Sequence, residues 1–393
     1  MTRNIVPIGP YHPLLEEPEY FKFTVEGETV VDADLDIGWN HRGIEKLAEA
    51  KNYEQIPFLV ERICGICSTS HPFAYVQAVE DVGGIEVPER AQYIRTIIGE
   101  LERVHSHLLW VGLAGHFIGY NTVFMWAWRY REPILDIFEK ISGNRNHYAM
   151  FKVGGVRRDI KEENIPELLT AINDADKFTT MITKAVLDDP ILQVRLKGVG
   201  ALTKQDAIDL CVLGPTARPS GLAIDIRKDH PYAAYDKVDW EMIVMEGGDV
   251  FAKAAVRLLE TIESIKIIRQ CLKNMPSGPI ELEDVEIPPG EGIGVHEAPR
   301  GEVFHYIRSN GGPYPERHKI RAPSFMNVPS FKKTVIGQKL ADAAIITAAV
   351  DPCYCCTERM IAIDPDNRVI AQGKDLVRMS QEKTEDLKRR FRK

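Results

Sequence analysis

Two CxxC cysteine pairs lie near opposite ends of this chain of 393 residues. Cys64 and Cys67 form the first pair, and Cys353 and Cys356 form the second. The two sulfurs of such a pair can converge on one small object, and thiolates are soft donors that suit nickel, iron, zinc or copper(I). If both pairs serve one site, the fold must bring residues near 65 and residues near 355 together.

Other uses of these cysteines stay open on spacing alone. A zinc ribbon also has two CxxC pairs, but they usually stand about 15–20 residues apart. A thioredoxin-like redox pair needs one CxxC and leaves the other unexplained. Of the remaining cysteines, we expect Cys211 and Cys271 to be small buried residues of apolar helices, and Cys355 to point away from a metal.

Composition narrows the class of protein. Hydrophobic residues make up 44% and charged residues 27%, as is usual for a globular chain. The formal net charge of -8 argues against a protein that binds nucleic acid through a general positive field. Seven cysteines, an odd number, and the lack of an apolar leader favour reduced thiols over a disulfide scaffold. No apolar run approaches the ~20 residues of a spanning helix, so we predict no transmembrane segment.

Hydrophobic periodicity predicts an α+β protein that is mainly α-helical. Alternating apolar residues predict two strands, 21–25 and 31–35, that are joined by a turn at 26–28. Helical spacing predicts four long helices, of which the last is the longest: 88–108, 133–141 with Gly143 as its cap, 165–187 and 249–272.

These elements suggest three regions within one integrated catalytic domain. We expect a β-rich region at 1–60, a helical bundle core at 61–275 and a loop-rich α/β region at 276–393 that carries the second pair. Proline and glycine predict loops at 276–301 and 309–330, with smaller strands beside them such as 303–307. The charged segment 381–393 predicts a solvated helix.

The sequences around the cysteines resemble the paired metal-binding motifs of nickel–iron hydrogenase large subunits. The two motifs read ERICGICSTSH at 61–71 and DPCYCCTER at 351–359. Further similar segments are HRGIE at 41–45, ELERVHSHLL at 100–109, SGNRNHYAMFKVGGVRR at 142–158, GPTARPSG at 214–221 and EAPRGE at 297–302. The chain is most similar to the energy-converting, membrane-bound group 4 enzymes, which are related to the quinone-site subunit of complex I. That subunit has lost the metal cysteines, and this chain keeps all four.

This resemblance implies the hydrogenase large-subunit fold, with a central bundle of long helices, and a Ni–Fe centre whose iron carries CO and cyanide. It implies that Cys64 and Cys353 bind nickel terminally, and that Cys67 and Cys356 bridge nickel and iron. The cysteines left over are too few for an iron–sulfur cluster held by four thiolates, so none is expected in this chain.

The resemblance also suggests residues that act beside the metals. Arg300 is expected over the open metal face, where a guanidinium stabilises negative charge and hydrogen-bonds cyanide, and Asp351 could orient it through an ion pair. His71 follows Cys67 by four residues, which on a helix would place it where it can tune the bridging sulfur. Without this context, Arg300 would be read as an exposed loop arginine and His71 as a core histidine.

Two glutamates complete the expected site. Glu17 matches the family's proton-relay glutamate, and Glu16 is the nearest alternative. Without the matching context, Glu17 would be interpreted as a surface carboxylate near a turn. Glu45 matches the glutamate that holds magnesium in many soluble relatives. Its histidine partner is replaced here by Arg359, which cannot bind a cation, so this departure argues against magnesium and suggests that Glu45 pairs with Arg359 instead. The segment after Arg359 is either a removable extension or a retained tail.

The implied function is the reversible oxidation of H2, coupled to ferredoxin and to membrane ion translocation. A small subunit would supply the nearest iron–sulfur cluster, and membrane ion-translocating subunits would couple through 41–45 and the N-terminal hairpin. The chain would then be a peripheral subunit at the cytoplasmic face of the membrane, with no nucleic-acid partner. The alternative is a sulfur-reducing or non-catalytic complex I-like subunit with a structural metal.

Overall fold

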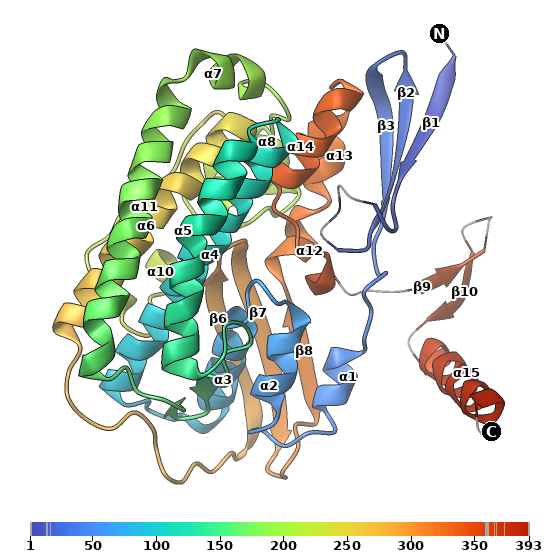
Figure 1. The fold of residues 1–393 in the computed structure, drawn as a ribbon. Coiled ribbons are helices and arrows are strands. Elements are labelled where there is room, and N and C mark those ends of the chain that lie inside the picture. Colours follow the sequence, from blue (N-terminus) through green and yellow to red (C-terminus); the bar gives the residue numbers. More distant parts are fainter. Residues whose placement is uncertain are drawn as a thin grey trace.

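A computed structural model describes residues 2–12, 15, 17–357, 361–364, 366, 368–372 and 374–391. Figure 1 shows a bundle of long helices and a three-stranded sheet packed beside it. A second three-stranded sheet, formed by the N-terminus, is separated from the bundle by the short helices of residues 323–349. A short hairpin and the final helix lie apart from this body. The predicted mainly helical α+β architecture is confirmed.

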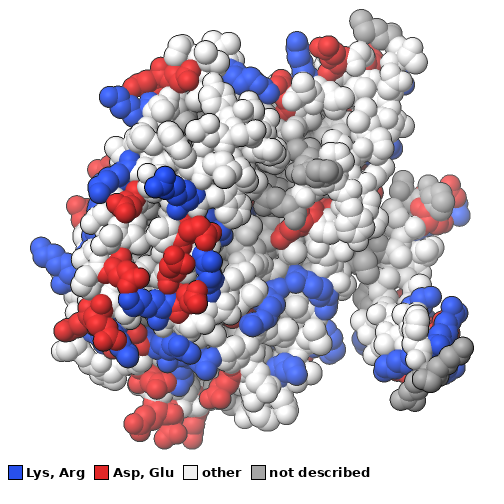
Figure 2. All heavy atoms as spheres, in the orientation of Figure 1, with Lys and Arg blue, Asp and Glu red and all other residues white. Residues whose placement is uncertain are grey.

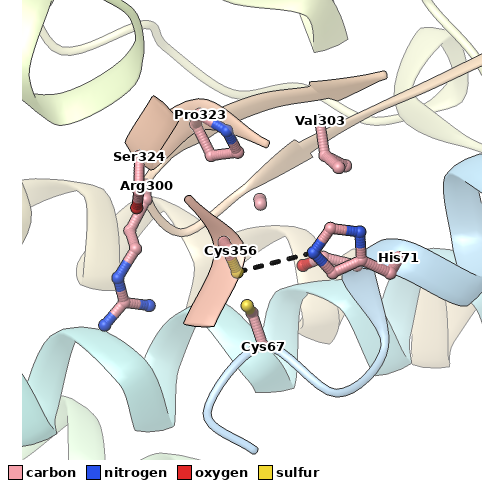
Figure 3. A pocket seen from close by; sticks show the side chains of 9 residues that line it. Cys67, His71, Arg300, Val303, Pro323, Ser324 and Cys356 are labelled. Atoms are coloured by element: carbon pink, nitrogen blue, oxygen red, sulfur yellow. Dashed lines mark hydrogen bonds between the residues drawn. The ribbon is translucent and has the colours of Figure 1, made fainter. Parts of the chain in front are cut away.

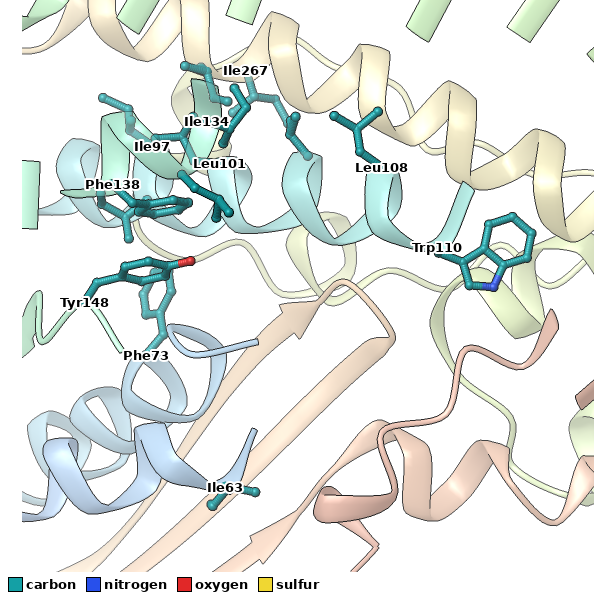
Figure 4. Packing of buried hydrophobic residues seen from close by; sticks show 14 of the residues in the cluster. Ile63, Phe73, Ile97, Leu101, Leu108, Trp110, Ile134, Phe138, Tyr148 and Ile267 are labelled. Atoms are coloured by element: carbon teal, nitrogen blue, oxygen red, sulfur yellow. The ribbon is translucent and has the colours of Figure 1, made fainter. Parts of the chain in front are cut away.

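Four long helices form the bundle: α4 (Glu89–Phe117), α5 (Asn121–Ser142), α6 (Ile165–Asp188) and α11 (Val250–Asn274). The central helix α4 packs against both α5 and α11. Its predicted apolar stripe is fully buried, and Leu101 and Leu108 face the neighbouring helices in Figure 4. Burial of each such side chain contributes about 1.5–3 kcal/mol.

Two predictions about these helices are wrong. Helix α5 begins at Asn121 rather than at Pro133, because packing along α4 sustains the helix through a proline whose missing N–H removes only one backbone bond. The longest helix is α4 with 29 residues, not α11 with 25. The predicted cap at Gly143 is confirmed by its left-handed conformation.

The N-terminal sheet has the antiparallel order β1-β2-β3, from β1 (Arg3–Ile8), β2 (Tyr20–Glu26) and β3 (Thr29–Asp36). Phe21 and Phe23 of β2 are buried, as their alternation predicted. A register shift opposite Val25 makes Val31 the extra residue of a bulge, so Val30 is buried in its place.

The second sheet has the order β6-β7-β8, from β6 (Pro289–Ala298), β7 (Gly301–Asn310) and β8 (Arg317–Arg321). Helix α3 (Ser70–Gly83) packs across β6 and β7. The loops predicted at 276–301 and 309–330 are therefore wrong in part. Glycines that suggested a loop instead allow close approach, since a Cβ on Gly294 would lie 1.9 Å from the carbonyl oxygen of Ala74 in α3.

Shorter elements connect these layers: α1 (Ile44–Ala48), α2 (Ile56–Val60), β4 (Phe151–Lys152), β5 (Gly155–Val156), α7 (Pro190–Leu196), α8 (Lys204–Asp209), α9 (Gly214–Ala217), α10 (Ile226–Asp229), α12 (Pro323–Asn327), α13 (Ser330–Val335), α14 (Ala343–Ala349), β9 (Ile361–Ile363), β10 (Val369–Gln372) and α15 (Lys374–Phe391). Single 3-10 turns lie at Glu61–Ile63, Glu162–Asn164, Arg218–Ser220, Tyr235–Lys237, Leu340–Asp342 and Tyr354–Cys356.

The remaining predictions are mixed. Helix α15 is exposed along its length, as expected for a solvated charged helix, and Figure 2 shows charges of both signs on it and on the bundle.

Cys271 is buried in α11 as predicted, but Cys211 is exposed in the turn after α8, where its φ is 52°. In the described part of the chain, no helix is both long and apolar enough to cross a membrane. The division into three regions stays a prediction.

Candidate metal centre

The two cysteine pairs converge in the folded chain, as the sequence predicted. The Sγ atoms of Cys64, Cys67, Cys353 and Cys356 all lie within 4.8 Å of one another. Cys356 is half-buried and the other three are buried. Hydrogen bonds from Cys353 and Cys356 hold the pKa of Cys64 well below its usual range, whereas burial raises the pKa of Cys353. Four soft sulfurs at this spacing fit a nickel–iron centre, and they also fit zinc.

The first cysteine loop, residues 61–69, joins α2 to α3 and is tied to the bundle. Glu102 of α4 accepts hydrogen bonds from the Thr69 amide, at 2.5 Å, and from the Ser70 hydroxyl. This carboxylate caps the start of α3, and burial raises its pKa to about 7. Glu61 accepts from the Ala149 amide at 2.5 Å, which ties the start of the loop to the segment after α5.

The second cysteine loop, residues 351–357, follows α14. Its entry residue, Asp351, has a φ of 53°, which is rare for a residue with a side chain. The Cys353 amide donates to Ser324 Oγ at 2.9 Å, so α12 supports the loop from one side. The Cys355 amide donates to Glu17 Oε2 at 2.7 Å from the other side. The loop thus takes its shape from segments far away in the sequence.

Arg300 forms the predicted ion pair with Asp351. Its Nη2 lies 2.7 Å from Asp351 Oδ1, and its Nε donates to the Asp351 carbonyl at 2.8 Å. The guanidinium is fully buried and also contacts Ser106 Oγ at 3.3 Å. Burial alone would lower the pKa of Arg300, but Asp351 and the nearby thiolates raise it, so the side chain stays charged. A fixed positive charge therefore lies beside four sulfurs.

Two glycines hold the backbone that carries Arg300. A Cβ on Gly214, at the start of α9, would lie 2.4 Å from Cα of Gly301. Both glycines have positive φ, 62° and 119°. The GPTARPSG and EAPRGE segments, which are distant in the sequence, can therefore approach closely only because both positions lack a side chain.

His71 contacts a different sulfur from the one predicted. Cys67 lies in the turn before α3, so the helical spacing argument is wrong. The Nε2 atom of His71 lies 3.6 Å from Cys356 Sγ, which Figure 3 marks with a dashed line. Burial lowers the pKa of His71 to about 4, so the ring is neutral.

A small cavity of about 10 Å³ opens beside the sulfurs, and Figure 3 shows the side chains around it. It is lined by Cys67, Ser70, His71, Ala298, Arg300, Val303, Pro323, Ser324 and Cys356. This volume holds about one water-sized molecule. The space next to the cysteines therefore suits a very small reactant.

Glu17 lies next to a sulfur of the second pair. Its Oε1 atom is 3.9 Å from Cys353 Sγ, and burial raises its pKa. Glu16, the alternative, lies outside the described residues. The structure thus puts a carboxyl group that holds its proton more tightly than usual beside one of the four cysteines.

Known protein families match most of this sequence. Residues 118–287 and 282–359 match the family described as the 49 Kd subunit of respiratory-chain NADH dehydrogenase, and residues 42–112 match nickel-dependent hydrogenase. The chain is 41% identical over 399 residues to the membrane-bound hydrogenase subunit alpha of Pyrococcus furiosus, covering 97% of this chain and 93% of that one. This chain belongs to the hydrogenase large-subunit family of group 4, which is related to complex I.

Two further comparisons support this family assignment. The carbon monoxide-induced hydrogenase of Rhodospirillum rubrum is 41% identical over 364 residues, which cover 91% of this chain and all of that one. A solved structure, that of the membrane-bound sulfane sulfur reductase, an archaeal respiratory membrane complex, has a chain with a TM-score of 0.86 and 33% identity. It covers 91% of this chain and 98% of its own, which confirms the predicted fold.

Arg42 contacts both cysteine loops, which sequence reasoning missed. Its guanidinium donates to the carbonyls of Arg62 and Ile63, at 2.6 and 3.0 Å, and to that of Cys355 at 3.4 Å. Arg42 therefore links the first cysteine loop to the second. Its place in the hydrogenase-like HRGIE segment marked it as a family residue, but no spacing rule predicted this contact.

Glu45, from the same segment, faces cations. Its carboxylate lies 3.1 Å from Lys319 Nζ and 3.6 Å from an Arg317 nitrogen, and it accepts the Ile320 amide at 3.0 Å. Arg359, its expected partner, lies outside the described residues, so that pairing stays a prediction. The contacts that are described tie α1 to β8.

Glu19 is a second site residue that the sequence analysis missed. Its side chain is fully buried and accepts a long hydrogen bond, 3.5 Å, from Thr357 at the end of the second cysteine loop. Burial raises the pKa of Glu19 to about 8. The available signal was its spacing of two residues from Glu17, which puts both carboxyl groups near the same loop.

Proposed function

We propose that this chain is the catalytic subunit of a nickel–iron hydrogenase, which interconverts dihydrogen with protons and electrons. The observation that carries the proposal is the convergence of four sulfurs beside a buried arginine and a protonatable glutamate. The family of the chain supports it, because relatives named as hydrogenases align along almost its full length.

A Ni–Fe centre with CO and cyanide on iron suits this set of donors. Cys64 and Cys353 would bind nickel terminally, and Cys67 and Cys356 would bridge the two metals. When bound, the centre would supply the site at which the H–H bond breaks or forms. The cavity next to Cys67 and Cys356 is of a size that suits such a small reactant.

The protein's own residues would handle charge and protons. Arg300, held by Asp351, would offset the negative charge of the thiolates from a buried position. Glu17 would take the proton from the Cys353 sulfur to Oε1 during H2 oxidation and return it during H2 evolution. Burial raises the pKa of Glu17, which favours the protonated form that a proton-accepting carboxyl needs.

Electrons would pass to a small subunit with an iron–sulfur cluster and then to ferredoxin. Three cysteines lie outside the centre, too few for a cluster held by four thiolates: Cys211 is exposed after α8, Cys271 is buried in α11 and Cys355 lies in the second cysteine loop. Relatives named as membrane-bound hydrogenase and as part of a membrane complex support attachment to membrane ion-translocating subunits. We place this chain as their peripheral partner on the cytoplasmic face.

Sulfane sulfur reduction is the second candidate function. It is supported by the 33% identical chain of the sulfane sulfur reductase complex, which has the same fold. Retention of all four cysteines and the confined cavity favour the hydrogenase.

The deciding experiment is elemental analysis and infrared spectroscopy of the purified complex, with Cys64→Ser as the control. Stoichiometric nickel, together with infrared bands of CO and cyanide that vanish in the control, is the expected result. Zinc without nickel would contradict the proposal and support a structural metal in a complex I-like scaffold. Sulfane sulfur reduction without hydrogen turnover would favour the second candidate.

A further inference from the structure

Three buried histidines form a chain that leads away from the metal centre. His71 Nδ1 lies 3.0 Å from His305 Nε2, and His305 Nδ1 lies 2.9 Å from His318 Nε2. His71 comes from α3, whereas His305 and His318 come from the adjacent strands β7 and β8. All three are almost wholly buried. The free end of His71, Nε2, is the atom that contacts Cys356 Sγ at 3.6 Å (Figure 3).

The two outer histidines, His305 and His318, are neutral. Burial lowers the pKa of His318 to about 3 and holds that of His305 well below its usual value. A neutral imidazole has one N–H donor and one acceptor nitrogen. Two nitrogen–nitrogen contacts in series therefore permit only two proton orders: every N–H points toward Cys356, or every N–H points away from it.

The two ends of the chain favour the first order. With every N–H pointing toward the metal centre, His71 donates to the Cys356 sulfur, and a thiolate there can only accept. In the reverse order, the bare nitrogen of His71 would face the negative sulfur. His318 would then hold a buried N–H at Nδ1, an atom for which the described residues provide no hydrogen-bond partner.

The neighbour of His318 does not change this conclusion. The ring of Tyr75 lies 5.4 Å from the His318 ring, between centroids. Its hydroxyl donates to the Tyr53 carbonyl at 3.1 Å, so that proton is directed elsewhere.

We propose that His305 and His318 are positioning residues that hold His71 in the tautomer whose Nε2–H donates to Cys356. This inference deepens the proposed function and rests on it, because Cys356 must be a metal-bound thiolate. A donor on this sulfur withdraws electron density and lowers its affinity for a proton. The two sulfurs of the second pair then differ: Cys356 keeps a donor, while Cys353 faces the proton-accepting carboxyl of Glu17.

The test compares His305→Leu with His305→Gln in the purified complex, using infrared spectroscopy, nickel content and hydrogen turnover. The leucine breaks the chain, so the CO band should move to lower wavenumber, nickel should be retained and turnover should fall about 10–100-fold. Glutamine can donate to His71 and accept from His318 in the same order, so it should restore the band position.

The matched control is His296→Leu. His296 is a buried histidine of the same sheet. It is hydrogen-bonded to the Tyr232 hydroxyl at 2.8 Å and is not one of the three linked histidines. Its variant should leave the CO band at the wild-type position. If His305→Leu leaves the band where His296→Leu does, or if glutamine shifts it as far as leucine, the inference is wrong while the proposed function stands.

A second variant covers the case in which His305→Leu does not yield a folded complex. His318→Phe removes only the outer member and should shift the CO band in the same direction by a smaller amount. An unshifted band would overturn the inference. A wild-type complex without nickel and without CO and cyanide bands would overturn both this inference and the proposed function.

Discussion

The two cysteine loops reach the same point by different means. The first, residues 61–69, is held by the bundle beside it, mainly through Glu102 of α4. The second, residues 351–357, is held by Glu17, Arg300 and Ser324, which come from three separate parts of the chain. Apart from Arg42, which contacts both loops, the first loop is held by groups between residues 102 and 149, whereas the second is held by groups from positions 17, 300 and 324.

The backbone shows the same contrast. Asp351 enters the second loop with a positive φ, a conformation that costs about 1–3 kcal/mol for a residue with a side chain. Its ion pair with Arg300 keeps it there. The second loop is therefore the strained and more dependent half of the centre, and the predictions below test that difference.

Cysteine replacement has the largest expected effect. Cys67→Ser and Cys356→Ser, one from each loop, should each remove nickel and hydrogen turnover, because a serine hydroxyl is a poor ligand for a soft metal. Elemental analysis and an assay of hydrogen evolution measure this, with Cys211→Ser as the unaffected control. A variant that loses neither nickel nor turnover would show that its loop does not serve the centre.

Glu17→Gln should lower hydrogen turnover by about 10²–10⁴-fold, because an amide cannot carry the proton. The amide oxygen can still accept the Cys355 N–H, so the second loop and its nickel should stay in place. Initial rates and nickel content of the same sample are the measurement. Loss of nickel in parallel with activity would mean that Glu17 acts on the loop's structure and not on protons.

Asp351→Ala should reduce the free energy of unfolding by about 3–5 kcal/mol, because it leaves Arg300 buried without its partner. Glu102→Gln, the matched change at the first loop, keeps one acceptor and should cost about 1–3 kcal/mol. Urea unfolding of the purified complex compares the two. Equal losses would contradict the view that the second loop is the more dependent one.

The buried carboxyl groups near the loops predict a pH dependence. Burial raises the pKa of Glu61 at the first loop to about 7 and that of Glu19 at the second to about 8, from an ordinary value of 4.5. The folded protein keeps protons that the unfolded chain loses, so this stability is complete below pH 4.5 and is lost as pH rises through 7 or 8.

Glu19→Gln should accordingly flatten the stability profile up to pH 8, whereas Glu61→Gln should flatten it only up to pH 7. Thermal unfolding of the complex at several pH values measures both. A profile in which Glu19→Gln changes nothing between pH 7 and 8 would mean that Glu19 is ionised in the folded protein.

Cys355→Ser has the smallest expected effect, within about 0.5 kcal/mol in stability, with hydrogen turnover nearly unchanged. The backbone amide of this residue donates to Glu17, and its thiol also interacts with that carboxylate; serine keeps the amide and supplies a hydroxyl donor in place of the thiol. Nickel content is the sharpest measurement. A loss of nickel would show that the second loop supplies a further ligand.

Much of the fold and part of the site could be predicted from the sequence. Helical spacing predicted the buried stripe of α4, because residues three and four apart lie on one face of any helix. Alternation predicted Phe21 and Phe23 as core residues for the equivalent reason in a strand. The motifs predicted that Arg300 would pair with Asp351 and that both cysteine pairs would meet.

Other features depended on tertiary structure alone. Glycine-rich β6 looked like a loop until α3 lay against it, and His71 contacts Cys356 rather than the cysteine four residues before it. The hydrogen bond from Arg42 to the Cys355 carbonyl and the contact between His71 and His305 each join residues that are more than 200 positions apart. Local patterns record which neighbours along the chain share a face, but contacts between distant segments are decided only when the layers pack, because no short-range preference distinguishes one distant partner from another.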